Sequence, residues 1–378
     1  MLFVCLLALS RVEGLAPQEK GTDLVALALR YLARHQNENG AWGRRPAACA
    51  CPDEPGSAAA PLDAPRRARV AALLSALDED DVERRLDAQR ELLREGPAIE
   101  PLLRDLEGGL ERRARTAEVL RVLRNAATSD DLEISSWALL AFLGAGFSHL
   151  SKDQHDGLSW GVVVRDGLRW VIERREDADG ASAAAAVAAL AVGEAYGMTA
   201  SALYQAAAQR AVDVVVAHPA KDARALAWQV MALKSAELGS LSFPRSAYDN
   251  RLAEMKRRRS EEPASLFLQA AQTMTVIFIE KSKMDVDLGG LPGADPSRMD
   301  VETAYLTSLA LWQYDGPGGS VWKGYRDVEK RWIVPSQIRE RGLCARGAWA
   351  ASGTAARLKF ACHGALMNEI YYAYASGP

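Results

Sequence analysis

The segment Tyr31–Gly43, YLARHQNENGAWG, has the pattern of a helix that ends in a turn. Its apolar residues stop after Ala33, a polar run follows, and Gly40 stands where a helix can end in a left-handed residue. A glutamine at this helix end and a tryptophan just after the glycine, Trp42, are unusual for a loop that faces solvent. The segment therefore either takes part in chemistry or holds parts of the fold together.

Outside this segment, apolar positions recur at helical spacing along almost the whole chain. No stretch shows the alternation of apolar and polar residues that is typical of a strand. The breaks between helical stretches carry turn residues such as Asp179-Gly180 and His218-Pro219. We therefore expect an all-α protein.

Helical stretches of two compositions alternate along the chain. Some are mixed and charged, whereas others, such as Ala181–Ala195, are almost entirely small and apolar. Because a helix that is apolar on most faces has to be enclosed by other helices, the alternation predicts concentric layers with about six inner helices. The predicted inner helices are Glu133–Ala145, Ala181–Ala195, Asp222–Glu237, Ser265–Ser282, Arg298–Tyr314 and Ala355–Tyr374.

Residues 44–128 do not follow this alternation. Residues 44–65 form a linker rich in proline, alanine and glycine, and residues 66–128 carry charged helices with breaks at Gly96-Pro97 and Gly108-Gly109. This succession of short charged helices resembles a HEAT-like helical repeat. We expect residues 66–128 to be an insert between the first helix and turn, residues 17–43, and the remainder of the layered part, residues 129–378.

The N-terminus has the features of a signal peptide. Met1–Leu9 is an unbroken apolar run, and Gly14 and Ala16 are small residues placed for cleavage after residue 16. The run is too short to span a bilayer, so we expect no integral membrane span in the mature chain. Residues 1–16 predict export to the periplasm or cell envelope; the alternatives are a buried N-terminal helix or a different start codon.

Composition excludes one class of partner. The formal net charge is −3, and the basic run Arg257–Arg259 is followed at once by Glu261 and Glu262. Nucleic-acid binding requires a concentrated positive surface, which this pattern does not provide. We therefore expect no nucleic-acid partner.

The cysteines leave several arrangements open. Without residues 1–16 the chain has Cys49, Cys51, Cys344 and Cys362, which could stay free or form two disulfides in three connectivities. A bridge between Cys49 and Cys51 would be strained, since one residue separates them. A zinc site that combines these cysteines with His363 matches no common ligand spacing. We therefore expect no metal and no cofactor.

The opening segment resembles the QW repeat of the squalene cyclase and protein prenyltransferase superfamily. That repeat places a small residue, an aromatic, an aliphatic, a glutamine, a glycine and a tryptophan at fixed offsets. Here these positions are Ala28, Tyr31, Leu32, Gln36, Gly40 and Trp42. Partial copies contain Trp170, with Arg175 in place of the glutamine, and Trp332, Gln337 and, after a longer loop, Trp349.

Several further segments look like bacterial proteins that carry prenyltransferase and squalene-oxidase repeats, so that the resemblance covers roughly residues 20–43 and 129–375. It implies an α/α toroid of about six outer and inner helix pairs. In that family the repeat is structural: the glutamine satisfies groups at helix ends, and the tryptophan links neighbouring outer helices. A shared fold says little about activity.

The catalytic motifs of the family are missing or misplaced. The cyclase acid motif, Asp-x-Asp-Asp, occurs as Asp78–Asp81, but it opens a charged helix of the insert, where aspartate is favoured as an N-cap. The prenyltransferase zinc motif, Asp-x-Cys, does not occur.

Other residues are weak candidates for chemistry. Asp285 and Asp287 form a second carboxylate pair in a loop, with Glu302 close in sequence; such pairs can bind a divalent metal or act as acid and base. Tyr305 and His363 lie on predicted inner helices and could line a cavity or simply pack in the core. We choose Trp228, Tyr305 and Trp312 as candidate ligand-binding residues.

These observations favour a noncatalytic binding or interaction protein built on the toroid. The alternative is a cyclase-like or lyase-like enzyme that acts on an isoprenoid or a polysaccharide inside the ring. The corresponding partner is a protein or a hydrophobic or glycan ligand. A closed cavity with buried carboxylates and aromatics would favour the enzyme, and a packed axis would favour the interaction protein.

Overall fold

The computed structural model describes residues 22–43, 49, 51, 63–95, 99, 102–103, 109–125, 129–176, 178–281, 283, 286–351 and 353–372. These residues are predominantly helical, which confirms the all-α prediction. The chain divides into two compact units, one formed by residues 1–51 and 129–378 and the other by residues 52–128. The predicted signal peptide lies outside the described residues. Among those residues, no helix has the length and apolar character needed to cross a bilayer.

The smaller unit contains three α-helices in the described part of the chain, α3 (Ala64–Ala76), α4 (Val82–Glu95) and α5 (Leu110–Asn125). Its core is built from short aliphatic side chains, among them Val70, Leu92 and Val119. Asp81 accepts a hydrogen bond at 2.8 Å from the backbone N–H of Glu83. The acidic run Asp78–Asp81 therefore contributes a cap at the start of α4, as expected from its position.

The larger unit holds the remaining elements. Their bounds are α2 (Thr22–Arg34), α6 (Ser129–Gly144), β1 (Gln154–His155), β2 (Leu158–Ser159), α7 (Trp160–Arg175), α8 (Ala183–Thr199), α9 (Ala202–Ala217), α10 (Ala223–Leu238), α11 (Ser246–Glu261), α12 (Leu266–Ile279), η2 (Leu291–Gly293), η3 (Pro296–Arg298), α13 (Val301–Asp315), α14 (Ser320–Ser336) and α15 (Thr354–Tyr372).

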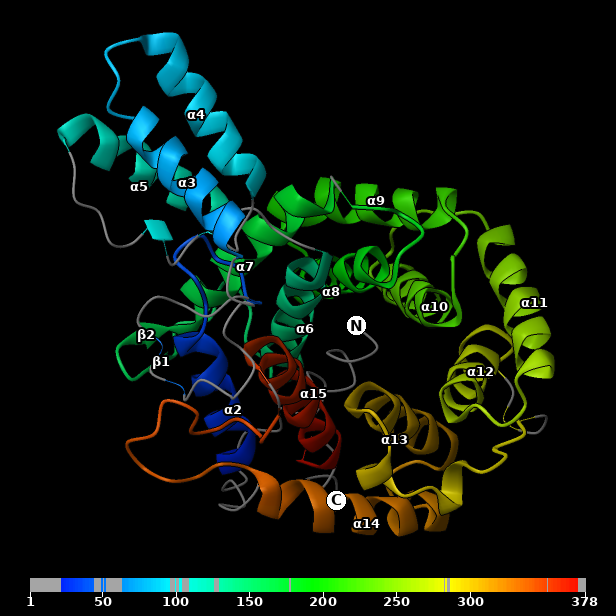
Figure 1. Ribbon diagram of the computed structural model, residues 1–378. Helices are drawn as coiled ribbons and strands as arrows, with labels where there is room; N and C mark the ends of the chain where they lie inside the picture. The colour runs from blue at the N-terminus through cyan, green and yellow to red at the C-terminus, as the bar shows by residue number, and fades with distance from the viewer. Residues whose placement is uncertain are drawn as a thin grey trace. The chain divides into compact units, whose positions relative to one another are not determined.

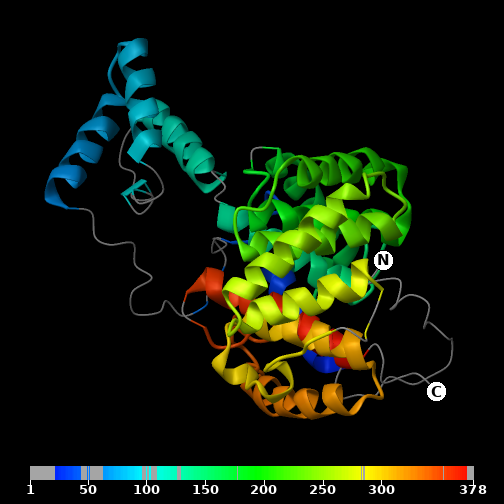
Figure 2. The same ribbon diagram turned by 90° about the vertical axis from the view of Figure 1, so that its right-hand side faces the viewer.

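Two sets of helices alternate within the larger unit. Helices α6, α8, α10, α12, α13 and α15, called the inner helices below, contact one another in that order, and α15 also contacts α6. Helices α2, α7, α9, α11 and α14, called the outer helices below, each contact one or two inner helices. Figures 1 and 2 show α14, coloured orange, at the edge of this unit. The inner helices correspond closely to the stretches predicted from the sequence.

Composition explains which helices are inner. Every residue of α8 from Ala183 to Ala195 is buried, since α8 contacts α6, α7, α9 and α10. In α11, by contrast, the described core residues are only Ala247, Tyr248, Arg251 and Met255. A helix with a charged face can lie only where that face reaches water.

The turn after α2 is held by Gln36. Its amide nitrogen donates to the carbonyl of Gly40 and to the carbonyl of Val163 on α7, each at 2.9 Å. The indole N–H of Trp42 donates to the carbonyl of Leu32 at 2.8 Å. One side chain thus closes the turn and ties the end of α2 to the first turn of α7.

The same arrangement recurs after α14. Gln337 donates to the carbonyls of Gly347 and Leu24, at 3.0 and 2.9 Å, and Trp349 donates to the carbonyl of Ile333 at 2.8 Å. Here the partner helix is α2, the first helix among the described residues. We call these two sets of contacts the first clasp and the second clasp; between them they connect α14 to α2 and α2 to α7.

Each clasp contains a glycine that fits tightly against the next outer helix. Gly40 has a φ of +93°, and a Cβ there would lie 2.4 Å from the carbonyl oxygen of Asp166. Gly347 has a φ of +98°, and a Cβ would lie 2.0 Å from the carbonyl oxygen of Leu27. The small residue of the repeat has a matching role, because a Cβ on Gly167 would lie 2.7 Å from the ring of Trp42.

Other joints between outer helices use different residues. Arg175, at the position of the glutamine, is buried, and its Nε and Nη1 have no hydrogen-bond partner among the described residues; the indole N–H of Trp170 likewise has none there. After α9, Gln229 of α10 donates to the carbonyl of His218 at 2.9 Å. After α11, Gln269 of α12 donates to the carbonyl of Pro263 at 2.9 Å. At these two joints an inner helix supplies the amide that Gln36 and Gln337 supply in the clasps.

The structure contains a short β-hairpin that was not predicted from the sequence. Strands β1 and β2 pair antiparallel, with Gln154 opposite Ser159 and His155 opposite Leu158. The turn between them is Asp156-Gly157, both with positive φ, which is the preferred chemistry of a two-residue hairpin turn. The strands are too short to produce a recognisable alternation.

Glu329 of α14 is a buried carboxyl between α13 and α14. Its Oε1 accepts a hydrogen bond from Ser308 at 2.5 Å, and its Oε2 has no partner among the described residues. Burial raises the pKa of Glu329 to about 8, an effect that the hydrogen bond from Ser308 only partly offsets. The folded protein therefore holds this carboxyl uncharged at neutral pH.

We predict that Gly347→Ala destabilises the protein much more than Gly342→Ala. Both glycines have positive φ, but a Cβ at Gly342 meets nothing within 4 Å. Gly342→Ala should lower the free energy of unfolding by about 1 kcal/mol, because alanine disfavours this backbone conformation. Gly347→Ala should cost about 3 kcal/mol, since the clash with Leu27 adds to that strain. Equal shifts of the urea midpoint for the two variants would contradict the close approach in the second clasp.

We also predict that Glu329→Gln changes how stability depends on pH. A carboxyl whose folded pKa is raised makes a contribution to stability that is lost as pH rises from its unfolded pKa toward its folded pKa. The free energy of unfolding of the variant, relative to that of the wild type, should therefore rise by about 1 kcal/mol per pH unit between roughly pH 5 and pH 8. Urea unfolding at pH 5, 6, 7 and 8 measures this gain. A difference between Glu329→Gln and the wild type that stays constant with pH would show that Glu329 ionises normally.

Candidate functional site at the N-terminal ends of four inner helices

Four inner helices carry the same pair of residue types. Each has a charged residue near its N-terminal end and an aromatic or imidazole ring about one helical turn later, so that both side chains lie on one face. The pairs are Glu133 and Trp137 on α6, Arg224 and Trp228 on α10, Glu302 and Tyr305 on α13, and Lys359 and His363 on α15. They form two layers, called the charge layer and the ring layer below.

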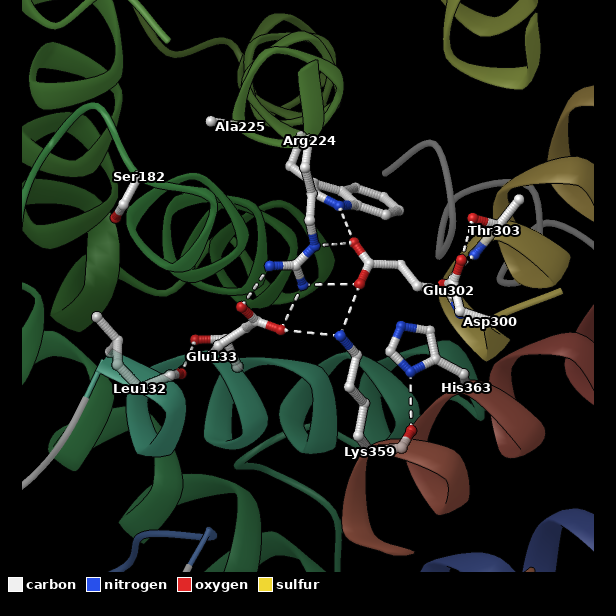
Figure 3. Close-up of polar contacts among 12 residues, drawn as sticks. Leu132, Glu133, Ser182, Arg224, Ala225, Asp300, Glu302, Thr303, Lys359 and His363 are labelled. Atoms are coloured by element: carbon white, nitrogen blue, oxygen red, sulfur yellow. Dashed lines mark hydrogen bonds and ion pairs between the residues drawn. The ribbon is translucent and has the colours of Figure 1, made fainter. Parts of the chain in front are cut away.

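The charge layer is a closed network of opposite charges (Figure 3). Arg224 donates from Nε and Nη2 to the two carboxylate oxygens of Glu302, at 2.6 and 2.7 Å. It also donates from Nη1 to Oε2 of Glu133 at 2.7 Å, and from Nη2 to Oε1 of the same residue. A bidentate guanidinium–carboxylate pair is the strongest form of such contacts, and Arg224 makes two.

Lys359 of α15 completes this network as its second cation. Its Nζ lies 2.8 Å from Oε2 of Glu302 and 3.4 Å from Oε1 of Glu133. Each glutamate therefore contacts both cations, and each cation contacts both glutamates. The four formal charges sum to zero, and they join α6, α10, α13 and α15.

Helix ends explain why these residues occupy these places. Asp222 caps α10 and Asp300 caps α13, each by accepting hydrogen bonds from backbone N–H groups. Glu302 follows the second cap, where the helix dipole favours a negative charge. Arg224 is in the first turn of α10, where the dipole disfavours a cation, so its stability there depends on the two glutamates.

Electrostatics keep both glutamates ionised. Burial by itself would raise the pKa of Glu302, but the hydrogen bonds from Arg224 and the charges of Lys359 and Arg224 outweigh it and hold the pKa at about 2. The pKa of Glu133 is also lowered: burial opposes the shift, and Arg224 and Lys359 produce it. The side chain of Glu302 is 3% exposed, whereas that of Arg224 is 32% exposed, so the cations form the solvent-facing side.

The ring layer lies directly behind the charge layer. Trp137 contacts the other three rings, with centroid distances of 4.7 Å to Trp228, 6.0 Å to Tyr305 and 4.4 Å to His363. Trp228 and Tyr305 are stacked at 6.3 Å with an interplanar angle of 14°. The indole N–H of Trp228 donates to Oε1 of Glu302 at 2.7 Å and connects the two layers.

His363 is neutral in this environment. Burial lowers its pKa to about 4, although the charge of Glu302 acts in the opposite direction. Its Nδ1 lies 2.8 Å from the carbonyl oxygen of Lys359, which identifies Nδ1 as the protonated nitrogen and a donor. Its Nε2 is buried and has no hydrogen-bond partner among the described residues.

The structure brings together part of the predicted site. Glu302, Tyr305, His363 and Trp228 meet in the two layers. Asp287 does not belong to them: its side chain is 82% exposed and accepts a hydrogen bond from Gly289 within its own turn. Asp285 lies outside the described residues. Trp312 is buried two helical turns beyond Tyr305 on α13, about 10 Å along the axis, and belongs to a different level of the core.

Sequence reasoning missed the other members of the site. Glu133, Arg224 and Lys359 are charges in or near the first turn of helices that are rich in apolar residues. Each precedes a ring by four positions. A search for a charge one turn before an aromatic residue on every predicted inner helix would have found them.

Comparison with protein-family models, with curated proteins and with solved structures finds no match for this chain.

The chemistry open to this site is narrow. A general acid needs a carboxyl that holds its proton near neutral pH, whereas Glu302 and Glu133 are held ionised by two cations each. His363 could act as a base through Nε2, but this atom lies among packed rings. The geometry therefore suits the joining of four helix ends better than proton transfer.

We predict that Arg224→Ala lowers the free energy of unfolding by about 3 kcal/mol, because it leaves two buried carboxylates opposite each other with only Lys359 between them. The matched control is Arg298→Ala, which removes an ion pair to Asp295 from a side chain that is 86% exposed. The control should cost no more than about 0.5 kcal/mol. Urea midpoints measure both, and a loss for Arg224→Ala as small as that of the control would show that the charge layer contributes little to stability.

Proposed function

We propose that this protein is a noncatalytic binding or interaction protein built on an α/α toroid. The observation that carries the proposal is the closed charge layer, in which Glu302, a candidate catalytic carboxylate, and Glu133 each contact both Arg224 and Lys359. Catalytic acids and bases require groups whose proton affinity is set near the working pH. Here the charged groups are neutralised by one another and connect helices.

The toroid is part of the proposal. The cyclic order of contacts among the inner helices supports it, and so does the placement of each outer helix against inner neighbours. The two clasps support a relationship to QW-repeat proteins, since glutamine and tryptophan make the contacts that the resemblance implies. Export to the cell envelope of a bacterium stays a prediction that rests on residues 1–16.

In this interpretation the larger unit is a rigid support. The four rings of the ring layer come from four inner helices and contact one another, which supports a packing role for them. Residues 52–128 interrupt the sequence of the larger unit, and proteins built of helical repeats commonly use extended binding surfaces. A protein partner is therefore the class that we favour.

A lyase-like enzyme is the second candidate. One observation favours it: Tyr305 and His363, with ring centroids 5.6 Å apart, lie behind Arg224, and Nε2 of His363 has no partner among the described residues. A tyrosine, a histidine and an arginine are a plausible set for proton abstraction from a sugar acid. Substrate access would require the charge layer to open.

The test is the content of the purified full chain. Native mass spectrometry, with parallel lipid extraction and glycan analysis, should find no organic molecule at a stoichiometric amount. A bound isoprenoid or glycan that is retained by Trp322→Phe, a change to a buried tryptophan of α14, but lost in Trp228→Phe would overturn the assignment of a protein partner and of a supporting role for the ring layer. Such a result would place a ligand at the ring layer.

A further inference from the structure

A cluster of metal-ligating side chains lies away from the charge and ring layers. His35, Cys49, Cys51 and Cys344 each offer one ligand atom, and these four atoms all lie within 4.8 Å of one another. His35 is the residue just after α2, in the opening segment, and Cys344 lies in the long loop of the second clasp. Four ligands therefore come together from segments that are about 300 residues apart in the chain.

The distances match a tetrahedral zinc site. Nε2 of His35 lies 3.3 Å from Sγ of Cys51, 3.3 Å from Sγ of Cys49 and 3.5 Å from Sγ of Cys344. The sulfurs of Cys49 and Cys344 are 3.8 Å apart. Zinc bonds of about 2.3 Å to sulfur and about 2.0 Å to nitrogen, at tetrahedral angles, require ligand separations of about 3.8 Å between sulfurs and about 3.5 Å between sulfur and nitrogen.

The surroundings orient the ligands. Nδ1 of His35 lies 2.7 Å from the carbonyl oxygen of Tyr31, so that the ring proton is on Nδ1 and the lone pair of Nε2 faces the sulfurs. Metal-bound histidines almost always have such a second contact. The backbone N–H of Cys51 points to Sγ of Cys49 at 3.4 Å. His35 and Cys51 are buried, which keeps water from competing for the site.

A disulfide is the competing explanation. A bond between Cys49 and Cys344 would need its sulfurs at about 2.05 Å. At 3.8 Å the two sulfurs are not bonded, and none of the four cysteines among the described residues is in a disulfide. A disulfide between Cys49 and Cys344 would not account for the approach of Cys51 and of Nε2 of His35 to the same point.

We propose that His35, Cys49, Cys51 and Cys344 bind one structural Zn²⁺ ion. Binding replaces the thiol protons, which pass to solvent, and involves no change of oxidation state. Four protein ligands leave no open position, so the ion has a structural rather than a catalytic role. It connects the end of α2, the chain that leads into residues 52–128, and the loop of the second clasp.

The test uses the full chain purified without added metal or chelator. Inductively coupled plasma mass spectrometry should find about one zinc per chain, in the wild type and in Cys362→Ala, which removes a buried cysteine outside the cluster. Cys51→Ser and Cys344→Ser should each weaken zinc retention in a chelator competition by about 100-fold or more. Retention in these variants equal to the wild type would overturn the proposal.

A second measurement covers the case in which the serine variants do not fold. The wild type, stripped by a chelator and titrated with Co²⁺, should develop the absorption of tetrahedral cobalt–thiolate at one equivalent. Alkylation of the untreated chain under denaturing conditions, with chelator and without reductant, should label Cys49, Cys51 and Cys344 completely. Recovery of a Cys49–Cys344 cross-linked peptide, or iron in place of zinc, would contradict the assignment.

Discussion

The carbonyl groups at the ends of the outer helices set the main constraint on this fold. Each helix leaves such groups without an intrahelical donor, and in a packed double layer they cannot all turn to water. Gln36 and Gln337 satisfy this need with a single amide that bonds to its own turn and to the next helix. Because Gln337 reaches Leu24, the second clasp also joins the last outer helix to the first. Where the glutamine is missing from an outer helix, Gln229 and Gln269 donate to the corresponding carbonyls from the inner layer.

A second constraint acts at the N-terminal ends of the inner helices. Four charges are partly removed from water, and they are stable there only as a neutral, fully bonded set. The set connects helices α6, α10, α13 and α15, and the four rings behind it pack against one another. Glu302, Tyr305 and His363 are the residues that make the site a candidate for chemistry. Their ion pairs and ring contacts favour a role in packing instead. The proposed zinc cluster lies near the helix ends that the clasps join and away from the charge layer. His35 directly follows α2, and Cys344 lies in the loop of the second clasp.

The sequence predicts the fold class and the inner helices well, because burial on all faces leaves a compositional mark such as the alanine run of α8. The role of Gln36 and Trp42 could be inferred through resemblance. The charge layer could not be inferred from the sequence, because arginine and lysine are ordinary residues on a helix surface. Only the packing of the helices brings Arg224 and Lys359 between two glutamates. The proposed metal cluster could not be predicted either, because a Cys-x-Cys pair fits no familiar zinc spacing and Cys344 lies about 300 residues further along the chain. The β1–β2 hairpin was missed because two residues per strand are too few to show a period.

We propose that the carboxylates of Glu302 and Glu133 are structural ion-pair partners and not catalytic acids. The decisive experiment is a ¹³C-NMR titration of the protein with labelled glutamate carboxyls, with Glu302→Gln used to assign the signal. With a pKa of about 2, the Glu302 signal should stay constant from neutral pH down to the acid limit of folding. A Glu302 carboxyl that takes up a proton near pH 6 or 7 would contradict the structural role, because it would show a carboxyl set for proton transfer.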